Sequence, residues 1–337
     1  MYAVTKLSLR PAMPATRNRG ATILNPGEGM DVRILGPLCL RHGTAHGRLT
    51  AAKPRKVLAL LLVHADQVAP VGTLARELWR DRPPASASTT LQTYVLQVRR
   101  MLRDLLAVDA AQVASEVLVT CSGGYEFRLG DGVLDLHAFE RLSTAGRRAL
   151  ASGDNVYAAR ALADALALWR GPALVDVPAG PLLAVEVRRL EEDRLTAVQQ
   201  RIEADLRLDR HHDVLSELTG LAAQYPLHEN LNAQYMLALY RAGRRTDALQ
   251  AYHRLRTVLV GELGLEPSPQ IQRLQQAILT GDPELERVPV GGEMLLDRLS
   301  REPVHIAWRV EGRPEFPDGR VAAGGYRTAV IPSPRRR

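Results

Sequence analysis

Apolar residues recur at helical spacing along residues 88–106. Intervals of four, three, four and three residues separate Leu91, Val95, Val98, Leu102 and Leu105. This spacing forms one stripe of an amphipathic helix. The opposite face carries hydrogen-bonding side chains and no acidic residue until Asp104; its members are Thr89, Thr90, Thr93, Leu96, Gln97 and Arg100, flanked by Arg99 and Arg103. Such side chains hydrogen-bond bases and phosphates, so we expect this face to contact DNA.

The elements around this helix follow the order of a winged helix-turn-helix. Two short apolar runs broken by Gly36-Pro37 predict a small sheet, and a Leu-rich helix begins near residue 52. A second helix spans about Val71 to Trp79 and ends before Pro83-Pro84. After the third helix, two apolar runs joined by Ser122-Gly123-Gly124 predict a hairpin. Three helices followed by a hairpin place the third helix where a recognition helix lies.

A repeat of helical hairpins is visible further along the chain. The segment from Gly243 to Leu249 aligns with Asp209 to Leu215 at an offset of 34 residues, and a third copy begins at Gly153. This offset is the period of the tetratricopeptide (TPR) helical hairpin. Each copy has Gly or Asp where one helix must end in a left-handed residue. The repeat therefore predicts that residues 136–279 form consecutive helices.

The fold class is mainly α with a small β component: a winged helix-turn-helix followed by an all-α, TPR-like domain. We divide the chain into a disordered extension (1–29), a winged-helix domain (30–132), a helical domain (133–283) and a mostly disordered tail (284–337). The two end segments are rich in proline and glycine and lack a clear hydrophobic period.

Positive charge is concentrated toward the amino terminus. Residues 30–132 carry 13 basic and 9 acidic residues, whereas residues 133–283 carry 17 and 19. Lys53, Arg55 and Lys56 crowd the start of the first helix, where the macrodipole disfavours cations. A bound phosphate would relieve this, and a solvated charge run is the alternative. In the hairpin, Thr120 and Ser122 are the side chains suited to a phosphate.

Other classes of protein are not indicated. None of the phosphate-loop, dinucleotide, zinc-protease, serine-hydrolase or C-x-x-C motifs that we sought occurs, so we expect no enzyme, cofactor or metal. The two cysteines, Cys39 and Cys121, lack metal-ligand spacing. With no long apolar run and no secretion signal, we expect a cytoplasmic protein without a membrane partner.

The chain resembles a known family in both predicted modules. The first matches the OmpR-type winged helix of Streptomyces antibiotic regulatory proteins at Leu74, Leu78-Trp79, Pro83-Pro84, Leu91–Val95, Val98–Arg100, Leu102 and Gly124-Tyr125. The second is similar to that family's bacterial transcriptional activator domain at Asp135, Phe139-Glu140, Leu168–Gly171, Pro226–Glu229, Leu239–Arg244 and Glu262–Pro269. Two departures stand out: Arg80 where the family usually has Gly, and a hairpin tip without a basic residue.

The resemblance implies a pathway-specific activator of a secondary-metabolite gene cluster. Members bind direct repeats in double-stranded promoter DNA, which implies dimers or side-by-side protomers, and they engage the RNA polymerase holoenzyme. The turn at Arg80, Asp81 and Arg82 is the expected polymerase contact, with a plain surface turn as the alternative. Two other functions stay open. One is a repressor or ligand-responsive regulator, and the other is a protein-binding scaffold that does not bind DNA.

Overall fold

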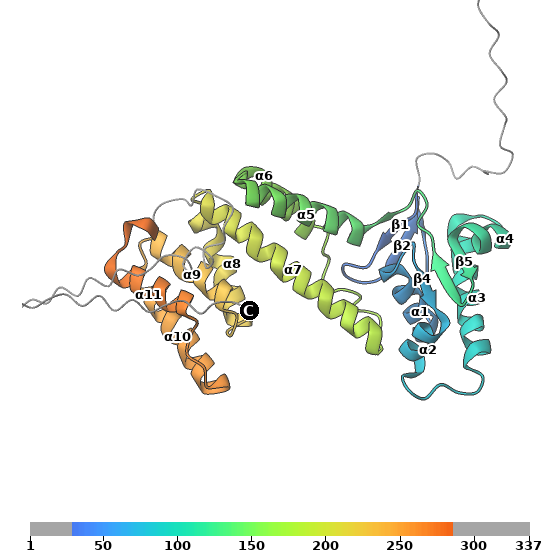
Figure 1. Cartoon of the computed structure of the whole chain (residues 1–337). Coiled ribbons are helices and arrows are strands. Elements are labelled where there is room, and N and C mark those ends of the chain that lie inside the picture. Colours follow the sequence, from blue (N-terminus) through green and yellow to red (C-terminus); the bar gives the residue numbers. More distant parts are fainter. Residues whose placement is uncertain (1–28, 286–337) are drawn as a thin grey trace, which may run out of the picture. The chain divides into compact units, whose positions relative to one another are not determined.

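The computed structural model describes residues 29–285. Its amino-terminal part contains three main helices and two small sheets (Figure 1). In chain order the elements are β1 (Asp31–Arg33), β2 (Cys39–His42), β3 (Ala45–His46), α1 (Ala52–Val63), β4 (Val68–Pro70), α2 (Val71–Trp79), α3 (Ala87–Leu106), α4 (Ala110–Gln112), the π-helical turn η1 (Val113–Val117), β5 (Leu118–Cys121), β6 (Gly124–Phe127) and β7 (Val133–Leu134).

Seven α-helices follow in the described part of the chain, and α5 and α6 pack side by side and against α7 (Figure 1). They are α5 (Asp135–Ser152), α6 (Asn155–Leu166), α7 (Pro181–Arg207), α8 (His211–Gln224), α9 (Glu229–Arg241), α10 (Arg245–Leu263) and α11 (Pro269–Thr280), and the 3-10 turn η2 (Pro283–Leu285) comes after them. The predicted fold class, mainly α with a small β component, is confirmed.

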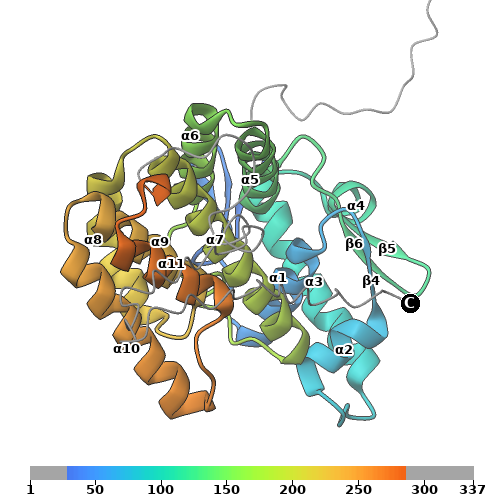
Figure 2. The ribbon, with the colours of Figure 1, turned by 60° about the vertical axis from the view of Figure 1, so that its left-hand side comes forward.

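The winged-helix elements follow the sequence pattern closely. Residues 57–62 of α1 are all buried, and the predicted apolar stripe of α3 is buried throughout. The predicted hairpin forms from β5 and β6 with Thr120 opposite Tyr125, and β4 pairs with β6 on the other side (Figure 2). The sequence did not indicate β4, because three residues are too short to show an alternating pattern.

The two modules share a sheet and a core. The predicted boundary at residues 132–133 falls just before β7, whose Leu134 pairs with Val32 in the parallel partner strand β1. One continuous cluster of buried apolar side chains runs from α1, α2 and α3 into α6 and α7 and includes Leu162, Leu183 and Leu190. A second cluster joins the carboxyl end of α7 to α8, α9, α10 and α11.

The helical repeat is present at the predicted offset. Helices α8 and α10 begin at His211 and Arg245, 34 residues apart. The preceding turns contain Asp209 and Gly243 with φ of 59° and 74°, and Gly153 before α6 has φ of 84°. All three copies therefore end a helix with the left-handed residue that the sequence required.

Ordered structure continues slightly beyond the predicted helical domain. Leu285 is buried, and its carbonyl accepts a hydrogen bond from Arg241 Nε at 2.8 Å. This contact lies two residues beyond the predicted end of the helical domain at residue 283. Apart from residues 29, 284 and 285, the predicted disordered segments lie outside the described residues. Among the described helices, none is long and apolar enough to cross a membrane.

A buried carboxylate from α2 caps the helix α7. Glu77 is 1% exposed, and its side chain accepts hydrogen bonds from the backbone N–H groups of Gly180, Leu182 and Leu183, the latter two at 2.9 and 3.0 Å. These N–H groups have no partner inside α7, and the helix dipole favours an anion there. The close approach requires Gly180, since a Cβ there would lie 2.2 Å from the Glu77 carbonyl oxygen.

Replacing Glu77 should therefore destabilise both modules together. We expect Glu77→Ala to lower the free energy of unfolding by roughly 2–4 kcal/mol, because it removes a charged acceptor and leaves buried N–H groups without it. Urea denaturation measures this. The control is Asp154→Ala, which removes the solvent-exposed cap of α6 at Tyr157 N and should cost about 1 kcal/mol. Equal losses for the two variants would contradict the buried cap.

Candidate nucleic-acid interface

The outward face of α3 is mainly polar. Thr89, Thr93, Arg100 and Arg103 are exposed, whereas Thr90 and Gln97 are half-buried at its edge. Leu96 lies within this face and is 50% exposed. The opposite face is packed into the core, so the outward side chains stand on a fixed helix. The face offers guanidinium, amide and hydroxyl groups together with one apolar side chain, which is the set that reads base edges in a major groove.

Arg99 of α3 and Thr120 of the hairpin are hydrogen-bonded to each other. Arg99 Nε and Nη2 donate to the carbonyl of Leu118 at 3.0 and 2.6 Å, and Nη2 also donates to Thr120 Oγ1 at 2.9 Å. Burial lowers the pKa of the Arg99 guanidinium. Arg99 thus ties α3 to the first strand of the hairpin, and its expected contact with DNA stays a prediction. The Thr120 hydroxyl retains its own proton as a donor.

The hairpin tip is held against the start of α2. Ser122 is exposed, and the Gly123 carbonyl accepts a hydrogen bond from Val71 N at 2.9 Å. The tip offers a hydroxyl and backbone groups, as the sequence indicated. This bond connects the hairpin to α2, and the Arg99 contact connects it to α3.

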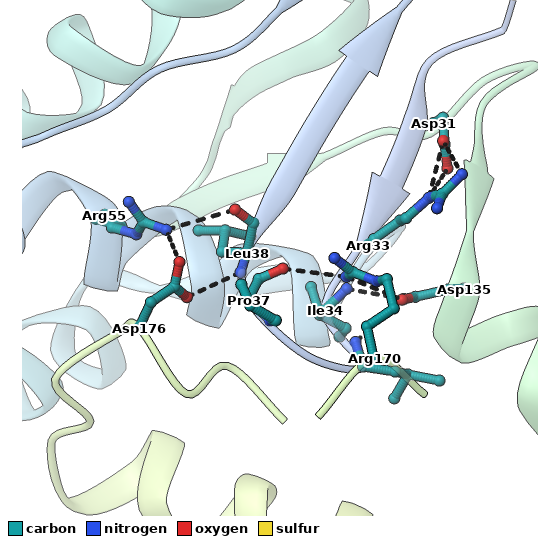
Figure 3. Close-up of polar contacts among 10 residues, drawn as sticks. Asp31, Arg33, Ile34, Pro37, Leu38, Arg55, Asp135, Arg170 and Asp176 are labelled. Carbon is teal, nitrogen blue, oxygen red and sulfur yellow. Dashed lines mark hydrogen bonds and ion pairs between the residues drawn. The ribbon is translucent and has the colours of Figure 1, made fainter. Parts of the chain in front are cut away.

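The basic cluster at the start of α1 divides into two parts. Lys53 is exposed and Lys56 is half-buried, and neither forms an ion pair within residues 29–285. Arg55 instead pairs with Asp176 from the loop before α7, and its Nη2 donates to the carbonyl of Leu38 (Figure 3). Its Nη1 donates to the carbonyl of Leu49. A carboxylate of the protein itself therefore pairs with the Arg55 guanidinium, and its expected contact with a DNA phosphate stays a prediction.

Two carboxylates, those of Asp135 and Asp176, attach the turn after β1 to the helical module. Asp135 accepts hydrogen bonds from Ile34 N and Leu35 N at 2.8 and 3.0 Å, with Arg170 Nη2 3.7 Å away (Figure 3). Burial raises the pKa of Asp135, and these backbone bonds and Arg170 oppose the rise. Asp176 accepts from Leu38 N at 2.8 Å. Residues of the helical module thus hold backbone groups of the winged helix.

The turn between α2 and α3 is exposed from Arg80 to Ser86. Its ends are firmly held, because Trp79 at the end of α2 stacks on Tyr94 of α3 with ring centroids 6.5 Å apart and an interplanar angle of 26°. The predicted polymerase-contact residues Arg80, Asp81 and Arg82 therefore stand in solvent on a fixed base.

Sequence reasoning did not identify Glu77 or Asp176. A signal existed for Glu77: it follows Leu74 by three residues, which places an acid on the core face of a short helix. A charge on an apolar face needs a specific partner. Asp176 lies in an irregular loop and offers no periodic signal.

Comparison with known proteins agrees with this architecture. The family model of the bacterial transcriptional activator domain matches residues 134–279. The regulatory protein DnrI of Streptomyces peucetius is 49% identical over 258 residues, which cover 77% of this chain and 95% of that protein. The chain belongs to the Streptomyces antibiotic regulatory protein family of transcriptional activators.

More distant members of this group support the same assignment. The transcriptional regulator RedD of Streptomyces coelicolor is 32% identical over 269 residues, covering 80% of this chain and 76% of the relative. A solved structure of EmbR of Mycobacterium tuberculosis, in complex with a low-affinity phosphopeptide, aligns with a TM-score of 0.70 and 30% identity. The aligned region covers 81% of this chain and 68% of the EmbR chain. The combination of winged helix and helical domain is thus shared with a solved regulator.

The contact between Arg99 and the hairpin predicts a local effect. We expect Arg99→Ala to lower the free energy of unfolding by about 1–2 kcal/mol, because the carbonyl of Leu118 loses a charged donor. Amide hydrogen exchange should accelerate in β5 and β6. Arg103→Ala is the matched control: Arg103 pairs with its exposed neighbour Asp104, so its loss should change stability by no more than about 0.5 kcal/mol. If the two variants behaved alike, Arg99 would not hold the hairpin.

Proposed function

We propose that this protein activates transcription of a secondary-metabolite gene cluster by binding promoter DNA through α3. The observation that carries the proposal is the outward face of α3, which is polar, free of acid up to Asp104, and fixed by a fully packed opposite face. Family membership supports the same assignment. No catalytic step is part of this proposal.

In the proposed complex, α3 enters the major groove. Arg100 and Gln97 hydrogen-bond base edges, with Thr93 and Leu96 beside them, the latter suited to a thymine methyl group. Thr89, Thr90 and Arg103 contact the flanking backbone, as do Lys53 and Lys56 at the start of α1 and Thr120 and Ser122 in the hairpin. The chain binds direct repeats as side-by-side protomers, and the turn at Arg80, Asp81 and Arg82 contacts the RNA polymerase holoenzyme.

A second candidate function is ligand-responsive regulation, including repression. A hollow of about 450 Å³ lies among α8, α9 and α10, which is within the usual size of small-molecule sites. Its lining includes Ala222, Tyr235, Ala251 and Arg254. A repressor would lower transcription in the assay below, whereas an activator raises it.

The experiment that tests the proposal uses purified full-length protein and the DNA upstream of the genes around its own gene. We expect a retarded complex on this DNA in a gel-shift assay, and more transcript when polymerase holoenzyme is added. A shuffled sequence of the same length is the control. A protein-binding scaffold without DNA affinity would give no retarded complex on either sequence.

Substitutions on α3 and α1 should separate base reading from backbone contact. We expect Gln97→Ala or Arg100→Ala to lose roughly 1–3 kcal/mol of binding at the operator and to relax discrimination against shuffled DNA. Lys56→Ala should weaken binding to both DNAs alike, because a phosphate contact carries no sequence information. Fluorescence anisotropy titrations at one salt concentration measure these affinities. A change of base preference in Lys56→Ala alone would contradict the placement of α3.

The turn after α2 should affect activation and leave operator occupancy unchanged. We expect the triple change of Arg80, Asp81 and Arg82 to Ala to keep operator affinity within about twofold while transcription by purified polymerase falls strongly. The reason is that a preorganised charged loop loses little entropy on docking to a partner. Full activation by this variant would remove the turn from the mechanism and direct attention to the helical domain.

A further inference from the structure

Arg80 occupies a backbone position suited to glycine. Its N–H donates to the Arg76 carbonyl at 2.8 Å and ends α2, and Arg82 N donates to the Trp79 carbonyl at 3.2 Å. The second bond closes a four-residue turn with Arg80 at the second position, where φ is 58° and ψ is −125°. These angles match the first central residue of a type II′ turn, a position dominated by Gly. An arginine there is strained by its Cβ.

The other non-glycine residues with positive φ have an evident local role. Asp66 accepts a hydrogen bond from Leu129 N, and Asp209 contacts His211. Leu174 is buried, with its N–H bonded to the Ile34 and Gly36 carbonyls. Ala107 closes α3 and carries only a methyl group. Asp is also tolerated at positive φ better than most side chains.

The Arg80 side chain has no such role within the protein. It is exposed and makes no hydrogen bond or ion pair within residues 29–285. The strain is therefore not offset by any contact of the guanidinium that the described structure contains. Strained backbone at an exposed site is a feature of residues that act on a partner.

The strained conformation is held from both sides. Trp79 stacks on Tyr94, and Glu77 is bonded to the start of α7. On the other side, Pro83-Pro84 restricts the backbone. The guanidinium is thus presented from a fixed point, which reduces the entropy lost when a partner binds it.

We propose that Arg80 is an anchor residue for an acidic patch on the transcription machinery, presented by a strained turn at the end of α2. The exposed turn carries two arginines, Arg80 and Arg82, against one acid, Asp81, so its net positive charge favours an acidic partner. A carboxylate accepts two hydrogen bonds from the planar guanidinium. This inference rests on the proposed function and identifies the residue and partner chemistry within it.

The test compares three single variants of Arg80 in the full-length protein. Arg80→Gly relieves the strain and removes the guanidinium: we expect the melting temperature to rise by about 2–4 °C and activated transcription to fall about tenfold. Arg80→Ala keeps Cβ and should lose transcription equally, without the rise in melting temperature. Arg80→Lys keeps the cation and should retain more activation than either. The operator affinity of all three variants should stay within about twofold of the wild-type value.

The matched control is Ala107→Gly. Ala107 also has a left-handed φ, of 54°, but lies at the far end of α3 and has no side chain to lose. This variant should raise the melting temperature and leave transcription unchanged. It therefore shows that relief of strain alone does not reduce activation.

Several results would overturn the inference. Full activation by Arg80→Gly would show that the guanidinium has no partner, and an unchanged melting temperature would show that the turn is not strained. A large loss of operator affinity would assign Arg80 to a phosphate instead. Failure of the wild-type protein to bind DNA or to raise transcription would refute the proposed function, whereas normal wild-type activation with an equally active Arg80→Gly would refute only the role of Arg80.

Discussion

The buried carboxylate of Glu77 at the start of α7 is the constraint on which the arrangement of both modules depends. A carboxylate with 1% exposure is tolerated only where charged hydrogen bonds replace its hydration. Here the N–H groups of Gly180, Leu182 and Leu183 provide them, and the dipole of a 27-residue helix adds a favourable field. Helix α2 cannot move away from the helical domain without leaving that charge unpartnered.

This constraint holds the helical domain of this chain against α2, the helix that precedes α3. Helix α2 supports α3 through the shared core and through the stack of Trp79 on Tyr94. Asp135 and Asp176 hold the turn after β1 in the same way. The position of α3 within the winged helix is therefore coupled to the helical domain through α2, and a change that moved the amino end of α7 would reach the outward face of α3.

The sequence predicted the parts of the fold that repeat and missed those that depend on one contact. Long periodic segments such as α3, and the 34-residue offset of α8 and α10, follow from burial patterns that many residues share. Strand β4 was missed because its three residues gain their structure from pairing with β6. The contacts of Arg55 and Arg99 within the protein could not be predicted, because the sequence gives the charge of a side chain but not the acceptors around it.

The backbone conformation of Arg80 also conflicts with the local preference of its residue type. In a foldable sequence, the conformational preference of each residue agrees with the overall fold. A residue whose conformation conflicts with its preference, and which has no stabilising contact within the protein, is therefore a candidate for a functional role. Glu77 breaks a rule as well, since it is an acid on a core face, but three backbone bonds stabilise it. Arg80 lies three residues later and has no such bond within the described chain. Because Glu77 and Trp79 fix the end of α2, the strain at Arg80 cannot relax by moving the helix, and the guanidinium stays presented to solvent.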